Sequence, residues 1–145
     1  MYEALEVLFV VILLVVLVRI IFWYKESSNN IQLLKSFDSS MPYAISEVDS
    51  RRFNLPQKGE FGAMSSCIKK FRSKSARRIK DADGGNSGLL RVFSGNYKIL
   101  LSIYSDEAYS IRLFKFDDSG DYIWQTSSYS INCDVKLMNT IEYGE

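Results

Sequence analysis

The sequence contains no histidine, and this absence narrows the chemistry that the chain can perform. Without imidazole there is no Ser-His-Asp triad, no Cys-His dyad, no imidazole metal ligand and no histidine acid–base catalysis. An enzyme that works with carboxylates alone stays open, but no carboxylate pair stands out in the sequence. We therefore expect no cofactor, no metal centre and no catalytic residues, and predict that the chain is not an enzyme.

Cysteine is scarce as well, with only Cys67 and Cys133. They are too far apart to form a CxxC site. In the cytosol both would stay reduced, whereas in an oxidising compartment they are the only possible intrachain disulfide. Cys133 lies in a stretch, 131–137, in which apolar and polar residues alternate, so we expect it to face the core. The sequence leaves open whether the two cysteines pair.

What the chain does contain is one long apolar run, Leu5–Tyr24, with twelve uninterrupted apolar residues from Val7 to Val18. A helix of twenty residues is about 30 Å long and matches the hydrocarbon thickness of a bilayer. We predict a single transmembrane anchor over residues 1–25. A cleaved signal peptide and a buried core helix are the alternatives. Four residues are expected at the membrane interface: Arg19, Trp23, Tyr24 and Lys25.

The charges that flank this run predict its orientation. Glu3 and Glu6 precede its apolar centre, whereas Arg19, Lys25 and Lys35 lie toward or beyond its C-terminal end. Because Lys and Arg are enriched on the cytoplasmic side of membrane proteins, the pattern favours a cytoplasmic C-terminal domain.

The stretch Ala63–Lys80 is the second informative one. Its apolar residues recur at steps of three and four, which predicts an amphipathic helix. A glycine-rich stretch, residues 81–88, is expected to end it. The remaining surface of this helix is basic and without acids, and we take it as the candidate binding surface: Lys69, Lys70, Arg72, Lys74, Arg77, Arg78 and Lys80.

Such a basic surface has several possible partners. Anionic lipid headgroups and an acidic protein surface both fit a basic helix tethered beside a membrane. Nucleic acid is disfavoured because the signatures of nucleic-acid-binding modules are missing. A helix that packs on the domain and leaves its charges in water is the alternative without a binding role.

From Leu89 onward the periodicity changes to two residues, which is typical of strands. Gly95-Asn96 predicts a two-residue hairpin turn between 89–93 and Tyr97–Tyr104. Further strands are expected over Ala108–Phe116, with Tyr109, Ile111 and Leu113 on one face, and over 122–127 and Ile131–Met138. The fold class is therefore α+β: a transmembrane helix (1–25), a linker with short elements (26–62) and a domain (63–145). In this domain we expect an antiparallel meander of four to five strands covered by the basic helix.

Two acidic loops resemble cation sites only in part. Asp81 and Asp83 begin like an EF-hand loop, but the later ligand positions do not fit. The cluster 117–121 fits a hairpin turn better than a metal site. We predict that both are loops.

When Tyr2 is counted as the first residue, Glu6 is the fifth residue of a long apolar helix, and an antiparallel sheet ends the chain. This arrangement resembles type IV pilins and pseudopilins, although Arg19 interrupts the apolar stem. The resemblance implies a structural subunit whose sheet domain lies outside the cytoplasm. The residues themselves favour a non-enzymatic, single-pass interaction module that binds a protein partner or an anionic membrane surface, and the pilin-type subunit is the alternative.

Overall fold

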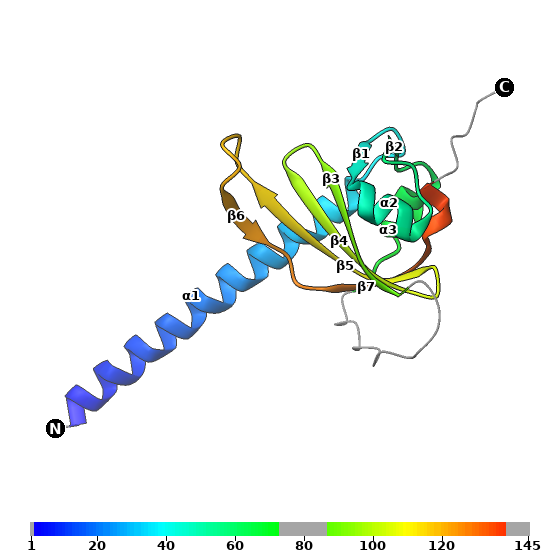
Figure 1. The fold of residues 1–145 in the computed structure, drawn as a ribbon. Coiled ribbons are helices and arrows are strands. Elements are labelled where there is room, and N and C mark those ends of the chain that lie inside the picture. The colour runs from blue at the N-terminus through cyan, green and yellow to red at the C-terminus, as the bar shows by residue number, and fades with distance from the viewer. Residues whose placement is uncertain (1, 73–86, 139–145) are drawn as a thin grey trace. The chain divides into compact units, whose positions relative to one another are not determined.

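A computed structural model describes residues 2–72 and 87–138. It begins with one continuous helix, α1 (Tyr2–Lys35), which contains the whole apolar run (Figure 1). The helix continues for eleven residues past Tyr24, so residues 26–30 are helical and do not form a linker. No glycine or proline occurs before Lys35 to interrupt the backbone hydrogen bonds.

The chain divides into two compact units, Met1–Leu33 and Leu34–Glu145. The second unit therefore begins well before residue 63, where the sequence predicted the domain to start. Residues 26–62 contribute the end of α1, two strands and a helix, namely β1 (Pro42–Ile45), β2 (Lys58–Glu60) and α2 (Glu47–Phe53). These elements are short, which is why they give little periodic signal.

The second unit contains one antiparallel sheet of seven described strands (Figure 1). The predicted meander is present as β3 (Gly88–Ser94), β4 (Tyr97–Tyr104), β5 (Glu107–Phe116) and β6 (Tyr122–Gln125). β1 and β2 extend the sheet beyond β3, and β7 (Tyr129–Asp134) pairs with the first half of β5. The fold is α+β as predicted, but the sheet is larger than four to five strands.

Two tight turns join the central strands. Ser94 pairs with Tyr97 across the predicted Gly95-Asn96 turn, and Gly95 has φ 53°. Between β4 and β5, Ser105 and Asp106 both have positive φ, 52° and 67°. Two consecutive residues with positive φ are typical of a type I′ turn, whose twist matches that of the strands it joins.

Alternation of side chains gives the sheet an inner and an outer face. The inner face forms the core, where Ile99, Leu101 and Ile103 of β4 are buried. Ile111 and Leu113 are buried with them, but Tyr109 is only half-buried. The prediction that Tyr109 shares their face is wrong because a β-bulge lies between Ala108 and Ser110 and shifts the alternation there.

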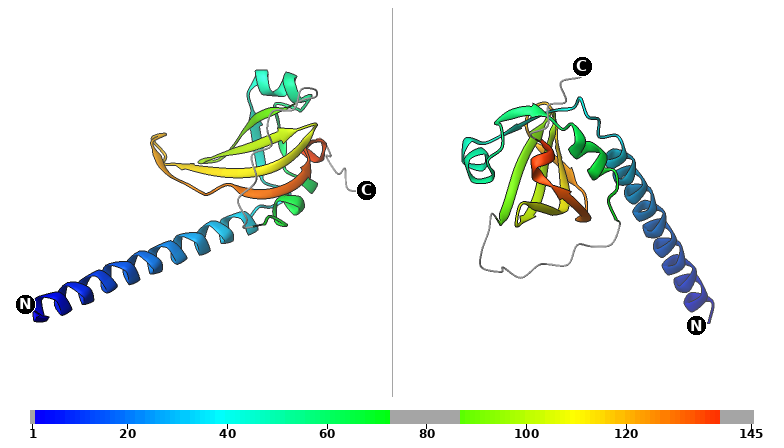
Figure 2. Two further views of the ribbon diagram at one scale, coloured as in Figure 1. Left: turned by 90° about the horizontal axis from the view of Figure 1, so that it is seen from below. Right: turned by 90° about the vertical axis from the view of Figure 1, so that its right-hand side faces the viewer.

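The helix α3 (Ala63–Ile68) packs against β7 and the 3-10 helix η1 (Val135–Met138), whereas α2 contacts β3 (Figure 2). Met64 and Ile68 are fully buried in this packing. The last strand ends at Asp134 and not at Met138 as predicted, because the following residues form η1.

The helix predicted over Ala63–Lys80 begins at Ala63 as expected but ends at Ile68, before its first lysine or arginine, so its described part is not basic. After one more turn, the N–H of Arg72 donates to the Ser130 carbonyl and the N–H of Ser130 donates to the Arg72 carbonyl. Pairing with β7 therefore replaces the helix. The side chains of α3 that cover the core in this region, Met64 and Ile68, are apolar. The rest of the expected helix lies outside the described residues.

Candidate functional site

The side chains of α1 identify it as a candidate membrane helix. It is the one described helix long and apolar enough to cross a membrane, and none of its most apolar window is buried. Trp23 and Tyr24 are 71% and 73% exposed and follow the run directly, as interface residues would. Arg19 and Lys25 are exposed as well. All four residues expected at the interface thus lie on one open helix.

The described part of the predicted basic surface consists of Lys69, Lys70 and Arg72, all of them exposed. They follow α3 directly and are fixed by the turn after Ile68 and by the Arg72–Ser130 bridge. Lys74, Arg77, Arg78 and Lys80 lie outside the described residues. We call Lys69, Lys70 and Arg72 the basic turn.

A disulfide between Cys67 and Cys133 holds the basic turn against β7, with the two Cα atoms 5.8 Å apart. Cys133 is buried, as its place in the alternating stretch predicted, and Cys67 is half-buried. Next to the bridge, Phe71 meets the ring of Tyr129 edge-on at 5.3 Å. The sequence left open whether the two cysteines pair, because neither their distance in the fold nor the redox compartment can be read from their spacing.

Beside the disulfide lies a shallow depression of about 300 Å³, lined by Cys67, Lys70, Arg72, Ser130, Ile131 and Asn132. Its two cations and polar backbone suit an anionic group such as a carboxylate. Hydrogen bonds from Ser40 and Ser39 hold the pKa of Asp38, 31 residues earlier in the chain, below its ordinary value, and the charge of Lys69 adds only a small contribution. The case for an anionic group therefore depends on Lys70 and Arg72 at the depression itself.

The turn 117–121 is explained by its own hydrogen bonds. The Asp117 carboxylate accepts from the amides of Ser119 and Asp121, at 3.0 and 2.8 Å, and from the Ser119 hydroxyl at 2.9 Å. These bonds lower the pKa of Asp117. Within residues 2–72 and 87–138 no three His, Cys, Asp or Glu side chains gather as metal ligands would. The Asp81/Asp83 loop lies outside those residues.

Sequence reasoning did not identify the outer face of the sheet as a candidate binding surface. Strand pairing places Arg91 and Arg112 on either side of Leu100, and Phe93 and Phe114 on either side of Lys98. Because cross-strand partners point to the same face, cations and apolar side chains alternate there in both directions. The sequence did contain a signal for this face, namely the polar half of the alternating positions in each strand.

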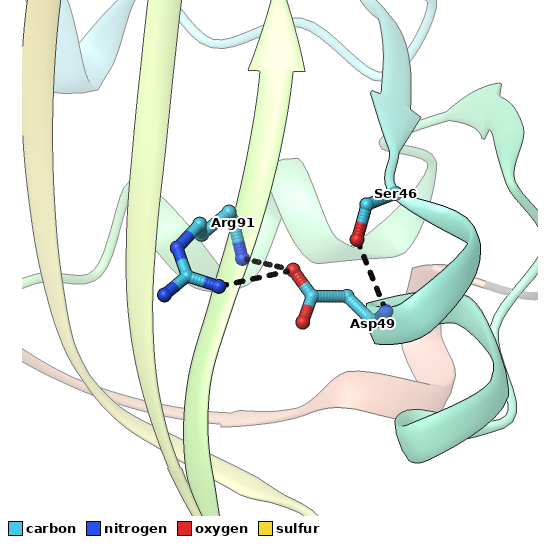
Figure 3. A network of polar contacts seen from close by, with 3 residues as sticks. All are labelled: Ser46, Asp49 and Arg91. Carbon is cyan, nitrogen blue, oxygen red and sulfur yellow. Dashed lines mark hydrogen bonds and ion pairs between the residues drawn. The ribbon is translucent and has the colours of Figure 1, made fainter.

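One buried network supports this face at its edge (Figure 3). Asp49 in α2 is 3% exposed, and its carboxylate lies 3.9 Å from the Arg91 guanidinium and accepts the Arg91 N–H at 3.3 Å. The Asp49 N–H in turn donates to the Ser46 hydroxyl at 3.1 Å, which caps α2. Arg91 is thus held in place and partly neutralised.

Comparisons with protein-family models, with curated proteins and with solved structures each gave no match.

Proposed function

We propose that this chain is a single-pass membrane protein whose sheet domain is a non-enzymatic module that binds an acidic surface on a partner protein. The observation that carries the proposal is the pair of features found on one chain: an apolar helix with no burial, and an exposed basic turn. A helix of this kind exposed to water would aggregate, so a bilayer is its natural environment.

The basic turn supports binding because its position is fixed. The Cys67–Cys133 disulfide and the Arg72–Ser130 bridge restrain the segment at both ends. Cations that are already ordered lose less conformational entropy on binding than cations on a free tail. An acidic protein surface is preferred over lipid headgroups because the depression beside Lys70 and Arg72 has the size and polarity to accept a side-chain carboxylate.

Binding is tested with the full chain in nanodiscs of neutral lipid, with poly-glutamate as the acidic probe. We expect binding at low salt that weakens as salt rises, because the Debye length shrinks from about 10 Å at 0.1 M to about 3 Å at 1 M. The triple variant Lys69→Gln, Lys70→Gln, Arg72→Gln should lose it.

The matched control changes three exposed cations elsewhere, Lys35, Arg51 and Lys136, to glutamine and should keep the binding. Binding to anionic vesicles but not to poly-glutamate would instead assign the basic turn to lipid headgroups. If the chain binds neither, the basic turn is only a solvated surface and the proposal is wrong.

The side of the membrane is a separate part of the proposal. Disulfides persist in oxidising compartments and are reduced in the cytosol, so the Cys67–Cys133 bridge favours a domain outside the cytoplasm. This is opposite to the orientation expected from Arg19, Lys25 and Lys35. We give the disulfide more weight because the charge bias depends on those three residues alone.

Thiol trapping in cells tests the orientation. Cells are quenched in acid, free thiols are blocked, and a polyethylene-glycol maleimide is added before or after reduction. With the domain outside the cytoplasm, two labels attach only after reduction. If both cysteines are already blocked without reduction, the domain lies on the reducing side.

A pilin-type filament subunit is the second candidate. The uninterrupted α1, with Glu6 near its start and a disulfide-bonded antiparallel sheet after it, favours this alternative. Filament assembly would require Glu6, so Glu6→Gln should abolish filaments while the chain stays in the membrane. Absence of filaments in cells that express the unaltered chain would leave the binding module as the only candidate.

A further inference from the structure

The outer face of the sheet carries opposite charges at its two ends. One end, which we call the cationic end, holds Lys98 and Arg112 on β4 and β5. The other, the acidic end, holds Glu107 and Asp134, which are exposed and pair with each other across β5 and β7. Tyr104 pairs with Glu107 and brings β4 into the same row. Along β4 the two ends are about 20 Å apart, at about 3.4 Å per residue.

Other charges on this face are balanced or lie at its rim. Arg91 is paired with the buried Asp49 (Figure 3). On β2, strand pairing places Lys58 and Glu60 on the outer side, one charge of each sign. Arg72 pairs with Ser130 at the open side of β7, level with the middle of the face, so it belongs to neither end. Among residues 2–72 and 87–138, the charges that distinguish the two ends of the face are therefore two cations at one end and two carboxylates at the other.

We propose that the outer face binds the outer face of a second copy of this chain. Two facing sheets can be related by a two-fold axis that lies between them, either parallel or perpendicular to the strands. A parallel axis would place the cationic ends against each other. A perpendicular axis reverses the strand direction, so that Arg112 of each copy faces Glu107 of the other, with Asp134 on the next strand and Lys98 at the outer end of the contact. The charge pattern selects the perpendicular axis.

The middle of the face suits this arrangement. At the level where the axis would pass, Ser102, Ser110 and Ser130 form one row across β4, β5 and β7. Their short side chains let the two sheets approach closely. Apolar side chains flank the row, and Phe93 and Leu89 are 46% and 44% exposed. A second copy would remove this apolar surface from water.

The area is sufficient for a specific contact. Four strands at about 4.8 Å spacing and a length of about 27 Å give roughly 500 Å² per copy, or about 1,000 Å² in total, which reaches the lower limit of specific interfaces. The anchor does not supply a competing contact, because the sequence has no Gly, Ala or Ser between Val7 and Tyr24 to let two helices pack closely. Self-association is thus assigned to the sheet.

Sedimentation of the full chain in mild detergent tests the proposal. The unaltered chain is expected to dimerise at low salt and to dissociate as salt rises. Variant A (Lys98→Glu with Arg112→Glu) and variant B (Glu107→Lys with Asp134→Lys) should each weaken the dimer by about tenfold or more, since every pair becomes repulsive. An equal mixture of A and B should form a heterodimer, because an acidic face then meets a basic one.

Formation of a heterodimer in the mixture shows that both variants are folded, since two unfolded variants would not pair. Their failure to form homodimers is then due to the lost contact. The control Lys35→Glu with Arg51→Glu makes the same change in charge at exposed positions off this face and should leave the dimer unchanged. The proposal is overturned if the unaltered chain is monomeric. It is equally overturned if A and B each dimerise as well as the unaltered chain, or if folded A and B do not pair.

Discussion

At the scale of single residues, the Asp49 carboxylate supplies the hydrogen-bond acceptor that a neighbouring strand would otherwise provide to β3. β1 pairs with β3 only at Val92 and Phe93, so the N–H of Arg91 faces an open edge. The Asp49 carboxylate accepts that N–H and lies beside the Arg91 guanidinium. A buried carboxylate without such partners would be costly, and a sheet edge without an acceptor would be open to other chains.

Asp49→Ala should lower the free energy of unfolding by about 1–3 kcal/mol, because it leaves a partly buried donor without an acceptor. Asp49→Asn retains an acceptor oxygen and should cost less. Glu47→Ala, at an exposed position of the same helix, should change stability by about 0.5 kcal/mol or less. Urea unfolding of the full chain in detergent measures all three, and equal losses for Asp49→Ala and Glu47→Ala would contradict the assigned role.

Asp117 predicts a dependence on pH. Hydrogen bonds from the Asp121 amide and the Ser119 hydroxyl lower its pKa below 3.8, so the folded state favours the charged carboxylate. The contribution of this carboxylate to the free energy of unfolding is present above the unfolded pKa and is lost as the pH falls through the lower, folded pKa. Asp117→Asn should therefore lower the melting temperature at pH 7, and the difference should shrink as the pH falls below about 4. A difference independent of pH would show that the charge is not involved.

At the scale of elements, the two predicted helices differ from their predicted lengths in opposite directions: α1 is longer and α3 is shorter. α1 extends to Lys35 because no residue within it breaks a helix. α3 ends at Ile68 because Arg72 bonds to Ser130 and Cys67 bonds to Cys133. Local periodicity favoured a longer helix there, but contacts with a strand about sixty residues later compete with it.

The composition of α1 predicts how it responds to charge. Val11→Lys with Leu14→Lys should abolish membrane insertion, because each charge at the centre of a span costs about 2.5–3.5 kcal/mol on insertion scales. The matched control Val11→Ile with Leu14→Ile keeps the run apolar and should insert normally. Carbonate extraction of membranes measures both variants. If the double lysine variant stays in the membrane fraction, α1 is not the anchor.

At the scale of the whole molecule, the disulfide joins residues 66 positions apart and closes most of the second unit into one loop. Closing a loop of that length reduces the entropy of the unfolded chain. On the chain-entropy estimate this is worth about 4 kcal/mol.

Cys67→Ser with Cys133→Ser should therefore lower the free energy of unfolding by about 2–4 kcal/mol under oxidising conditions. Reduction of the unaltered chain should give a similar loss, whereas the double variant should not respond to reductant. Denaturant unfolding with and without dithiothreitol provides the comparison. If reductant leaves the unaltered chain as stable as before, the bridge contributes nothing to its stability.

The elements of the fold could be predicted from the sequence wherever they depend on a local pattern. The apolar run, the change of period after Leu89 and the Gly95-Asn96 turn were each confirmed, because each depends on neighbouring residues and on water or backbone geometry alone. The three-residue strand β2 could not be predicted, since so short a segment shows no periodicity. The bulge at Tyr109 was not readable either, because it arises from how β5 fits β4 and β7.

An unbroken apolar helix before an antiparallel sheet, and the exclusion of histidine chemistry, follow from the order of residues alone. The contact of Cys67 with Cys133, the contact of Asp49 with Arg91, and the placement of cations and carboxylates at opposite ends of one face depend on how the chain folds. The physical reason is distance along the chain. Periodicity reports which side of an element faces water, whereas strand register and packing decide which residues from distant segments become neighbours.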